Sequence, residues 1–275
     1  SIFTHEHIRI MAIVKGPIVM TGSFGNASFY TMRGSDKVIV RTKGGASKEK
    51  IKTSPGFEGL RKQQKEWSAC AKFGSIARYA MGGLHRLADY NITPVLNGMG
   101  KNLIKLDAES EVGKRNLRLS AYREALEGFN LNRNYPFNSV LRVLMQGSIQ
   151  RETGTATVCV PRINTETDIL NVQRLPYFRL IVSLGVISDL TFDETVNEYS
   201  IVVPEVHGIA EVITGNWLPA ESIYETQTIT VQLDTDCMHK LTDACTLILS
   251  MGIEFGKVGF TGLPQEVKYA GSARV

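Results

Sequence analysis

The stretch that organises the chain runs from residue 14 to residue 57, VKGPIVMTGSFGNASFYTMRGSDKVIVRTKGGASKEKIKTSPGF. Within it, two short runs rich in β-branched and aromatic residues, 27–32 and 37–42, flank the tetrapeptide Arg33-Gly34-Ser35-Asp36. A four-residue connection that contains Gly and Asp between two such runs predicts a β-hairpin. A lysine-rich connector follows, and the pair Ser54-Pro55 then indicates a helix start, because Ser caps helices and Pro suits their first turn.

The segment before this stretch reads as a strand. Residues 1–14, SIFTHEHIRIMAIV, alternate, so that Ile2, Ile8 and Ile10 fall on one face and Phe3 falls on the other. A strand of this kind either completes its own sheet or adds to the edge of a neighbour's sheet. We refer to residues 1–10 as the arm, and we expect these four apolar residues to anchor it during self-assembly.

Basic residues gather in and after the predicted hairpin, close to Phe29 and Tyr30. The basic patch consists of Arg33, Lys37, Arg41, Lys43, Lys48, Lys50 and Lys52. Interleaved basic and aromatic residues hold nucleic acid through phosphate contacts and base stacking. A solvated edge strand that lysines protect against aggregation has the same composition, so the sequence leaves both interpretations open.

The hydrophobic period changes after the hairpin. From Pro55 to about Asp89, apolar residues recur every three or four positions, which predicts an amphipathic helix broken at Gly82-Gly83. Thr93-Pro94 signals a second helix, and residues 117–129 form a third helical or mixed segment.

Beyond about residue 130 the pattern is typical of strands. Short apolar or alternating runs separated by Gly, Pro and Asp predict seven to nine strands arranged as an antiparallel sandwich. The expected strands lie at about 140–144, 155–160, 178–186, 201–203, 209–213, 229–233, 247–255, 258–260 and 267–275.

The predicted fold class is therefore α+β. It comprises an N-terminal β-arm and hairpin (1–53), a helical region of two or three helices (54–130), and a C-terminal antiparallel β-sandwich (131–275).

Composition and charge limit the classes of partner. The 275 residues are 43% apolar and 21% charged, which is ordinary for a globular protein. The net charge of +4 is unevenly distributed: residues 1–110 hold 17 Lys/Arg and 8 Asp/Glu, whereas residues 111–275 hold 14 and 19. A basic part joined to an acidic part suits nucleic acid and equally suits head-to-tail contact between copies of the protein.

No targeting or redox signal stands out. No apolar run approaches the 18 residues of a membrane span, so we expect none. No signal peptide is visible, which makes a cytoplasmic location the default; an extracellular polymer would require a leader removed before Ser1. The four cysteines lack CxxC spacing and are expected to be small buried residues.

Catalytic and metal signatures are weak. His5 and His7 share a strand face without an evident third ligand. The segment 234–243 contains three Asp, one Cys and one His, but it lacks the remaining ligands and the glycine of a calcium loop. No Ser/His/Asp or Cys/His order is recognisable. We therefore expect no enzyme, no cofactor and no metal.

Three runs resemble an uncharacterised family of proteins from Bacteroidota bacteria. They are GSFGNASFYTMRGSDKVIVRTKGG (22–45), IKTSPGFEGLRKQQKEWSACAKFGSIAR (51–78) and EALEGFNLN (124–132). The family's K-x-x-P-x-F-x-x-x-R-like helix start corresponds to Lys52, Pro55, Phe57 and Arg61. The resemblance covers about the first half of the chain. It implies a shared fold and brings no activity or functional residues.

These observations predict a non-enzymatic structural subunit that assembles with copies of itself, through its arm and strand edges, into a filament or other polymer. The alternative is a nucleic-acid-binding or virion-associated protein that uses the basic hairpin.

Overall fold

The computed structural model describes the backbone of residues 11–14, and both backbone and side chains of residues 20–31, 37–42 and 44–275. The chain divides into two compact units, residues 1–61 and 62–275, which we describe separately.

The first unit contains the predicted hairpin. Strands β1 (Met11–Val14), β4 (Val38–Thr42), β3 (Ala27–Thr31) and β2 (Gly22–Phe24) form an antiparallel sheet in the order β1-β4-β3-β2. The β3–β4 register runs from Ala27 opposite Thr42 to Thr31 opposite Val38, which confirms the hairpin.

The hairpin is followed by short helical elements. Helix α1 (Lys48–Thr53) is capped by Ser47, whose Oγ accepts a hydrogen bond of 3.1 Å from the Lys50 N–H. The predicted start at Ser54-Pro55 is confirmed, because the 3₁₀ turn η1 (Pro55–Phe57) leads directly into α2 (Glu58–Ala80).

Helix α2 continues into the second unit. It ends at Ala80, just before Gly82 and Gly83, whose positive φ angles of 59° and 82° terminate a helix readily. The 3₁₀ turn η2 (Leu84–Leu87) follows, and α3 (Thr93–Ile104) begins at the predicted Thr-Pro pair. The expected break and the second helix are thus confirmed.

The third segment, predicted as helical or mixed, consists of two 3₁₀ turns, η3 (Leu119–Ala121) and η4 (Arg123–Leu126). Tyr122 lies between them with φ −138° and ψ 56°, which interrupts any helix. Leu119 and Leu126 are both buried and lie seven residues apart, so their spacing imitates a helical stripe.

A five-stranded antiparallel sheet forms the centre of the second unit. Its long strands β8 (Tyr177–Ser188) and β15 (Cys245–Val258) pair from Cys245 opposite Ser188 to Gly256 opposite Tyr177. Strands β11 (Ala210–Thr214) and β12 (Leu218–Pro219) pair with β8 on its other side. Strand β16 (Pro264–Arg274) pairs with β15, but only from Met251 onward.

A three-stranded sheet in the order β14-β6-β5 lies beside it, with β14 at Gln227–Gln232, β6 at Thr155–Val160 and β5 at Gln146–Gln150. Two small hairpins and three short helices complete the unit: β7 (Ile163–Asn164) with β13 (Ile223–Tyr224), β9 (Leu190–Asp193) with β10 (Glu198–Ile201), α4 (Phe137–Val140), α5 (Thr165–Asp168) and α6 (Thr235–Lys240).

Two expected strands are absent from the described structure. Residues 137–140 form α4, and Leu141 makes only an isolated bridge to Ile169, so the strand predicted at 140–144 is wrong. Pro136 favours this helical turn because it precedes the first helical residue and needs no N–H partner. Residues 258–260 are not a separate strand; they end β15 and begin the turn into β16.

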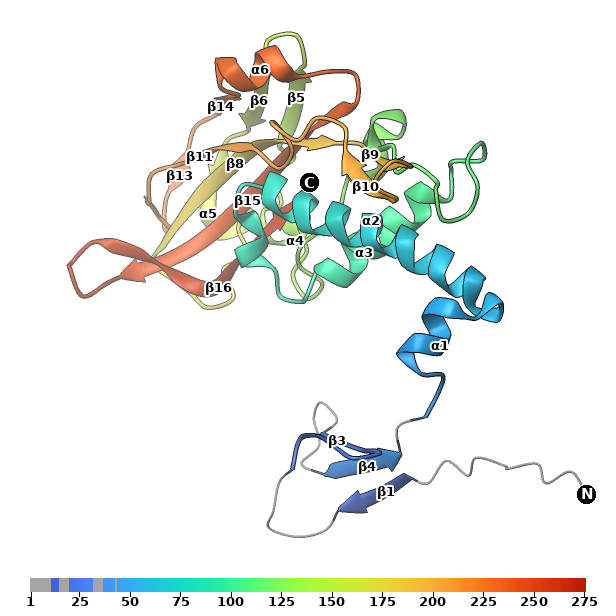
Figure 1. Cartoon of the computed structure of the whole chain (residues 1–275). Helices are drawn as coiled ribbons and strands as arrows, with labels where there is room; N and C mark the ends of the chain where they lie inside the picture. Colours follow the sequence, from blue (N-terminus) through green and yellow to red (C-terminus); the bar gives the residue numbers. More distant parts are fainter. Residues whose placement is uncertain (1–10, 15–19, 32–36, 43) are drawn as a thin grey trace, which may run out of the picture. The chain divides into compact units, whose positions relative to one another are not determined.

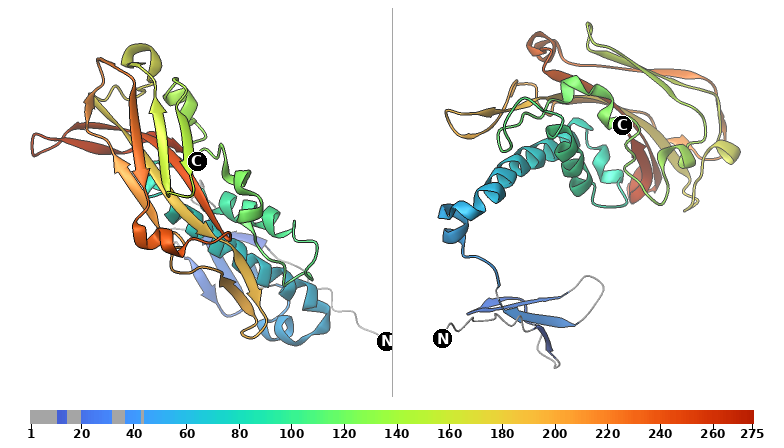
Figure 2. Two further views of the ribbon diagram at one scale, coloured as in Figure 1. Left: turned by 90° about the horizontal axis from the view of Figure 1, so that it is seen from above. Right: turned by 90° about the vertical axis from the view of Figure 1, so that its right-hand side faces the viewer.

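The central sheet is buried on both faces. Along β8, Leu180, Val182 and Leu184 pack with the three-stranded sheet, whereas Ile181 and Ile187 pack with α2, η2 and α3. The helices therefore cover one face and the smaller sheet the other (Figure 2). This arrangement is compatible with the predicted sandwich. Because its core joins helices to strands, no compact-unit boundary occurs at residue 130.

Among the described helices, none has both the length and the apolar character needed to cross a membrane.

Candidate assembly surfaces

The structure locates only part of the predicted functional sets. The arm residues Ile2, Phe3, Ile8 and Ile10, like Arg33 and Lys43 of the basic patch, lie outside the described residues. The remaining basic-patch residues are all exposed: Lys37, Arg41, Lys48, Lys50 and Lys52.

One basic residue of the hairpin meets an aromatic ring. The Arg41 guanidinium lies 5.6 Å from the centroid of the Tyr30 ring, on the neighbouring strand β3. Lys48, Lys50 and Lys52 all belong to the six-residue helix α1. The first unit thus presents cations and an aromatic face, a combination that can bind phosphate and stack on a base.

Strand β11 forms an edge of the central sheet, and Glu211 is its one charged residue. The Val186 N–H donates to Ile209 O at 2.9 Å, and the Gly215 N–H donates to Leu180 O at 2.9 Å. In an antiparallel ladder, hydrogen-bonded and non-hydrogen-bonded residue pairs alternate. Val212, opposite Ser183, belongs to a non-hydrogen-bonded pair, so its N–H and C=O point away from β8. The strand AEVIT contains neither Lys nor Pro, and Val212 and Ile213 are both exposed. Proteins usually protect such edges with charge, proline or short length.

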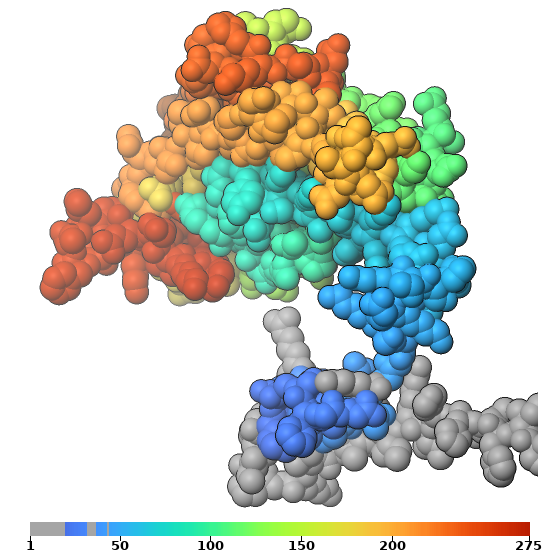
Figure 3. Space-filling view, in the orientation of Figure 1, coloured from blue at the N-terminus to red at the C-terminus, as the bar shows by residue number. Residues whose placement is uncertain are grey.

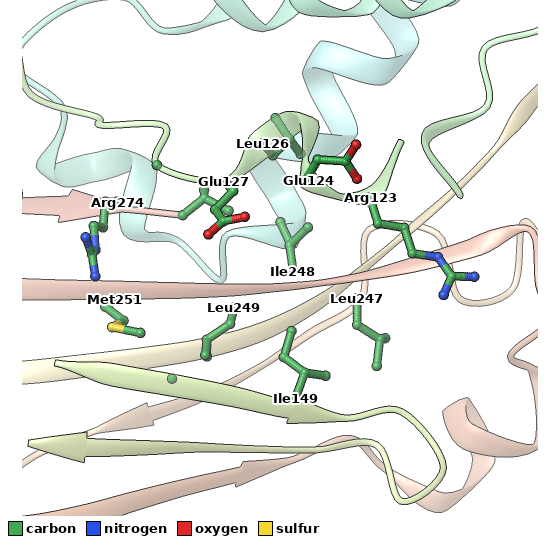
Figure 4. A pocket seen from close by; sticks show the side chains of 13 residues that line it. Arg123, Glu124, Leu126, Glu127, Ile149, Leu247, Ile248, Leu249, Met251 and Arg274 are labelled. Carbon is green, nitrogen blue, oxygen red and sulfur yellow. The ribbon is translucent and has the colours of Figure 1, made fainter. Parts of the chain in front are cut away.

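A groove lies on the other side of the second unit, beside β5 (Figure 4). No described strand pairs with the outer edge of β15 before Met251, and a cavity of about 380 Å³ occupies that position. We call it the β15 groove. Its apolar lining includes Ile149, Leu247, Leu249 and Met251.

Gly147 sets the distance between β5 and β15. A Cβ atom at this position would lie 2.5 Å from Leu249 Cδ2 and 2.8 Å from Met251 Cε. Glycine therefore lets the smaller sheet approach the leucine and methionine side chains, which leaves the lining of the groove apolar and closely packed.

The rim of the groove carries two arginines and two glutamates, so its formal charges balance. Arg123 Nε donates to Ser120 O at 3.1 Å, and the Arg274 guanidinium lies 5.5 Å from the Phe137 ring centroid. Glu124 and Glu127 also line the groove, and neither makes an ion pair within the described part of the chain.

An apolar projection lies at the far end of β15. We call residues 258–263 the hairpin tip; it ends the β15–β16 hairpin, which extends away from the rest of the second unit (Figures 1 and 3). Phe260 is fully exposed, and Leu263 is 67% exposed. The Gly259 N–H donates to Leu263 O at 2.8 Å and the Gly262 N–H donates to Gly259 O at 3.1 Å, so the turn is closed by its own hydrogen bonds.

Buried charges are engaged in structural networks. The Glu66 carboxylate accepts hydrogen bonds from Arg115 at 2.7 and 2.8 Å, from Lys101 at 2.8 Å and from the Gly113 N–H at 2.9 Å. Burial alone would raise the pKa of Glu66, but these donors lower it to about 2. A carboxylate that stays ionised and fully hydrogen-bonded holds α2, α3 and the following loop together and is a poor general acid or base.

A second buried carboxylate, Glu254 on β15, pairs with Arg86 and Arg179. The Arg179 guanidinium also stacks 4.2 Å from the ring centroid of Trp217. This network joins η2, β8 and β15, so it too has an evident structural role.

His207 and Ser188 do not form a nucleophile–base pair. His207 Nδ1 accepts a hydrogen bond of 3.0 Å from the backbone N–H of Ser188, and burial lowers the pKa of His207 to about 4. The Ser188 hydroxyl instead accepts from the Val203 N–H at 2.9 Å. The imidazole therefore packs as a neutral acceptor.

The Asp-rich segment 234–243 also has a structural explanation. Asp234 caps α6, its Oδ2 accepting a hydrogen bond of 3.1 Å from the Asp236 N–H. Cys237 and Cys245 are buried and free. Within the ranges that the structure describes, no three His, Cys, Asp or Glu residues are arranged to hold a metal ion.

The hairpin tip and the β15 groove are the surfaces that sequence reasoning missed. The tip had a signal in VGFTGLP, where Phe and Leu stand among turn residues. The groove had none, because segments 123–128, 147–149, 247–251 and 274–275 meet only in the folded chain. The chain matches no known family model, and comparisons with curated proteins and with solved structures found no significant match.

Proposed function

We propose that this chain is a non-enzymatic structural subunit that self-assembles through its arm and strand edges into a filament or other polymer. The proposal rests chiefly on the β11 edge, where outward-pointing backbone groups and exposed β-branched side chains occur without lysine or proline, and where Glu211 is the one charged residue of the strand. Such an edge is a template for an added strand.

The arm has the sequence of a strand that could be added. In an extended strand, the sequence would place Ile2, Ile8 and Ile10 on one face and Phe3 on the other, so the arm would offer apolar side chains to both sides of a sheet. On β11, Val212 and Ile213 likewise point to opposite faces. Main-chain hydrogen bonds would supply affinity, and the alternating side chains would fix the register.

Arm and acceptor are different surfaces of the same chain. A contact between unlike surfaces can be repeated from copy to copy, and it forms a ring or an open filament according to the rotation between copies. The opposite charges of residues 1–110 and 111–275 favour the same head-to-tail order.

The proposal is tested by blocking the edge without unfolding the sheet. Val212→Pro removes an N–H that points away from β8, so the β8–β11 ladder is kept, whereas Val212→Thr keeps both the N–H and the β-branched shape. We expect the proline variant and a deletion of residues 1–10 to lose long polymers in negative-stain electron microscopy and to sediment as smaller species. The threonine variant should assemble normally, and polymers of undiminished length in both blocked variants would contradict the proposal.

A nucleic-acid-binding or virion-associated function is the second candidate. It is favoured by the contact between Arg41 and Tyr30 and by the exposed lysines of α1. It differs from the first in predicting an affinity that falls steeply with salt.

A further inference from the structure

We propose that the hairpin tip of one copy inserts Phe260 and Leu263 into the β15 groove of a second copy. The inference rests on the proposed self-assembly and names a second contact that would operate in it. Both surfaces belong to the second unit and consist entirely of described residues.

The tip cannot fill the groove of its own chain. Leu249, in the groove, and Val258, at the start of the tip, lie nine residues apart on the continuous strand β15. At ~3.3 Å per residue this separation is roughly 30 Å. The two surfaces are therefore held apart within each copy, and their contact has to be intermolecular.

The apolar character of the two surfaces matches. Phe260 and Leu263 are the most exposed large apolar side chains of the hairpin, and no described residue covers Phe260. The groove is lined by aliphatic and methionine side chains, and its volume of about 380 Å³ falls in the range of pockets, ~300–1,000 Å³, that enclose organic groups. An aromatic anchor in such a pocket is typical of the residues that dominate binding energy at interfaces.

The turn is also suited to insertion. Its hydrogen bonds between Gly259, Gly262 and Leu263 satisfy backbone groups that would otherwise lose water on burial, and Pro264 has no N–H to satisfy. A closed turn loses little conformational freedom on binding.

Charged residues flank both the hairpin tip and the β15 groove. Lys257, immediately before the tip, is exposed, whereas Glu266 on the opposite strand lies 4.0 Å from Arg179 of its own chain. On the groove, Glu124 and Glu127 lie beside Arg123 and Arg274, and neither glutamate makes an ion pair within the described part of the chain. Lys257 of one copy could therefore pair with Glu124 or Glu127 of the second copy, whereas residues 258–263 of another tip offer no carboxylate.

Cysteine crosslinking between two different variants tests the contact. All four cysteines lie in the described part of the chain and only Cys159 is exposed, so Cys159→Ser provides the background. Phe260→Cys is mixed with Ile149→Cys and oxidised, and non-reducing electrophoresis is expected to show a mixed dimer. Phe260→Cys mixed with Val196→Cys, at an exposed position on the β9–β10 turn, should show none.

A charge exchange provides a second readout. Lys257→Glu should weaken self-association about tenfold in sedimentation velocity, and combining it with Glu124→Lys and Glu127→Lys should restore it. Phe260→Ser with Leu263→Ser should weaken association at least about tenfold, whereas Val196→Ser with Leu144→Ser, at equally exposed positions, should not.

The outcomes separate this inference from the proposed function. Polymers without the Phe260–Ile149 crosslink, or with crosslinks from Ile149→Cys to Ile8→Cys of the arm, would overturn the tip–groove contact and leave self-assembly standing. Dimers of Phe260→Cys alone would replace it with tip-to-tip contact. Monomers at every concentration, without any crosslink, would overturn both.

Discussion

At the scale of single residues, Glu66 is the ionisable group whose environment is most completely defined. Its carboxylate is fully buried and bound by Arg115, Lys101 and the Gly113 N–H. Removing one partner of such a buried network leaves uncompensated charge, which typically costs ~3–5 kcal/mol. We expect Glu66→Gln to lower the free energy of unfolding by about this amount at pH 7, measured by urea titration.

The pH dependence of that effect follows from the direction of the pKa shift. The pKa of Glu66 is lowered from 4.5 to about 2, so the unfolded state takes up the proton first as pH falls. The stabilisation is present above about pH 4.5 and is lost as pH falls toward 2, a change of about 3 kcal/mol at ~1.36 kcal/mol per pKa unit. The difference between wild type and Glu66→Gln should shrink over this window. Glu194→Gln is the control: the pair with Lys114 also lowers the pKa of Glu194, but it is exposed and screened by solvent, so the trend should be much smaller.

Substituting alanine for two different glycines should change the stability of the fold in opposite directions. A Cβ atom on Gly185 would meet the backbone carbonyl of Ala80, where α2 ends against β8, whereas a Cβ on Gly98 in α3 would meet nothing within 4 Å. Gly185→Ala should therefore destabilise the fold by ~1–3 kcal/mol through overpacking. Gly98→Ala should stabilise it by ~0.5–1 kcal/mol, because alanine favours the helix. Equal effects on the thermal midpoint would show that α2 does not pack on β8 in this way.

At the scale of elements, the local sequence correctly predicted helix boundaries at Ser-Pro, Gly-Gly and Thr-Pro pairs and strands at runs with a two-residue period. Ser54-Pro55, Gly82-Gly83 and Thr93-Pro94 marked real helix boundaries, and the period of two identified β6 and β8. Residues 117–129 were predicted only as helical or mixed, because two buried leucines seven apart are compatible with a helix and equally with two turns anchored in one core. In that segment tertiary contacts determine the conformation, and these contacts cannot be predicted from the spacing of residues along the chain.

The second candidate function, nucleic-acid binding, depends on helix α1. Changing Lys48, Lys50 and Lys52 together to Gln removes exposed charges from one six-residue helix. If these lysines bind phosphates, the slope of log K against log salt should decrease by ~0.7–0.9 for each lysine–phosphate interaction that the substitutions remove. Fluorescence anisotropy with labelled single-stranded DNA measures this slope. The matched control neutralises exposed lysines of the second unit: Lys105, Lys240 and Lys268. Absence of binding at low salt would exclude this function.

At the scale of the whole molecule, the layered fold explains why the β15 groove could not be predicted. Its lining comes from η4, β5, β15 and the end of β16, and it exists because β16 pairs with β15 only from Met251 onward. A strand's length can be read from its hydrophobic run, but the point where its partner stops cannot. The β11 edge is similar: its sequence was recognised as a strand, while its place at the end of a sheet follows from the topology.

Self-assembly also makes a prediction about the stability of the whole chain. If neighbouring copies bind the folded state and not the unfolded state, then raising the protein concentration stabilises the fold by mass action. A tenfold increase corresponds to about 1.4 kcal/mol for one such contact, or roughly 3–5 °C in thermal midpoint for a domain of this size. Differential scanning calorimetry over two decades of concentration should show this rise for the full chain. The deletion of residues 1–10 should show a smaller rise, because it removes the proposed contact of the arm and leaves the proposed tip–groove contact. A midpoint that is independent of concentration in the full chain would argue that the β11 edge and the β15 groove are not occupied by copies of this protein.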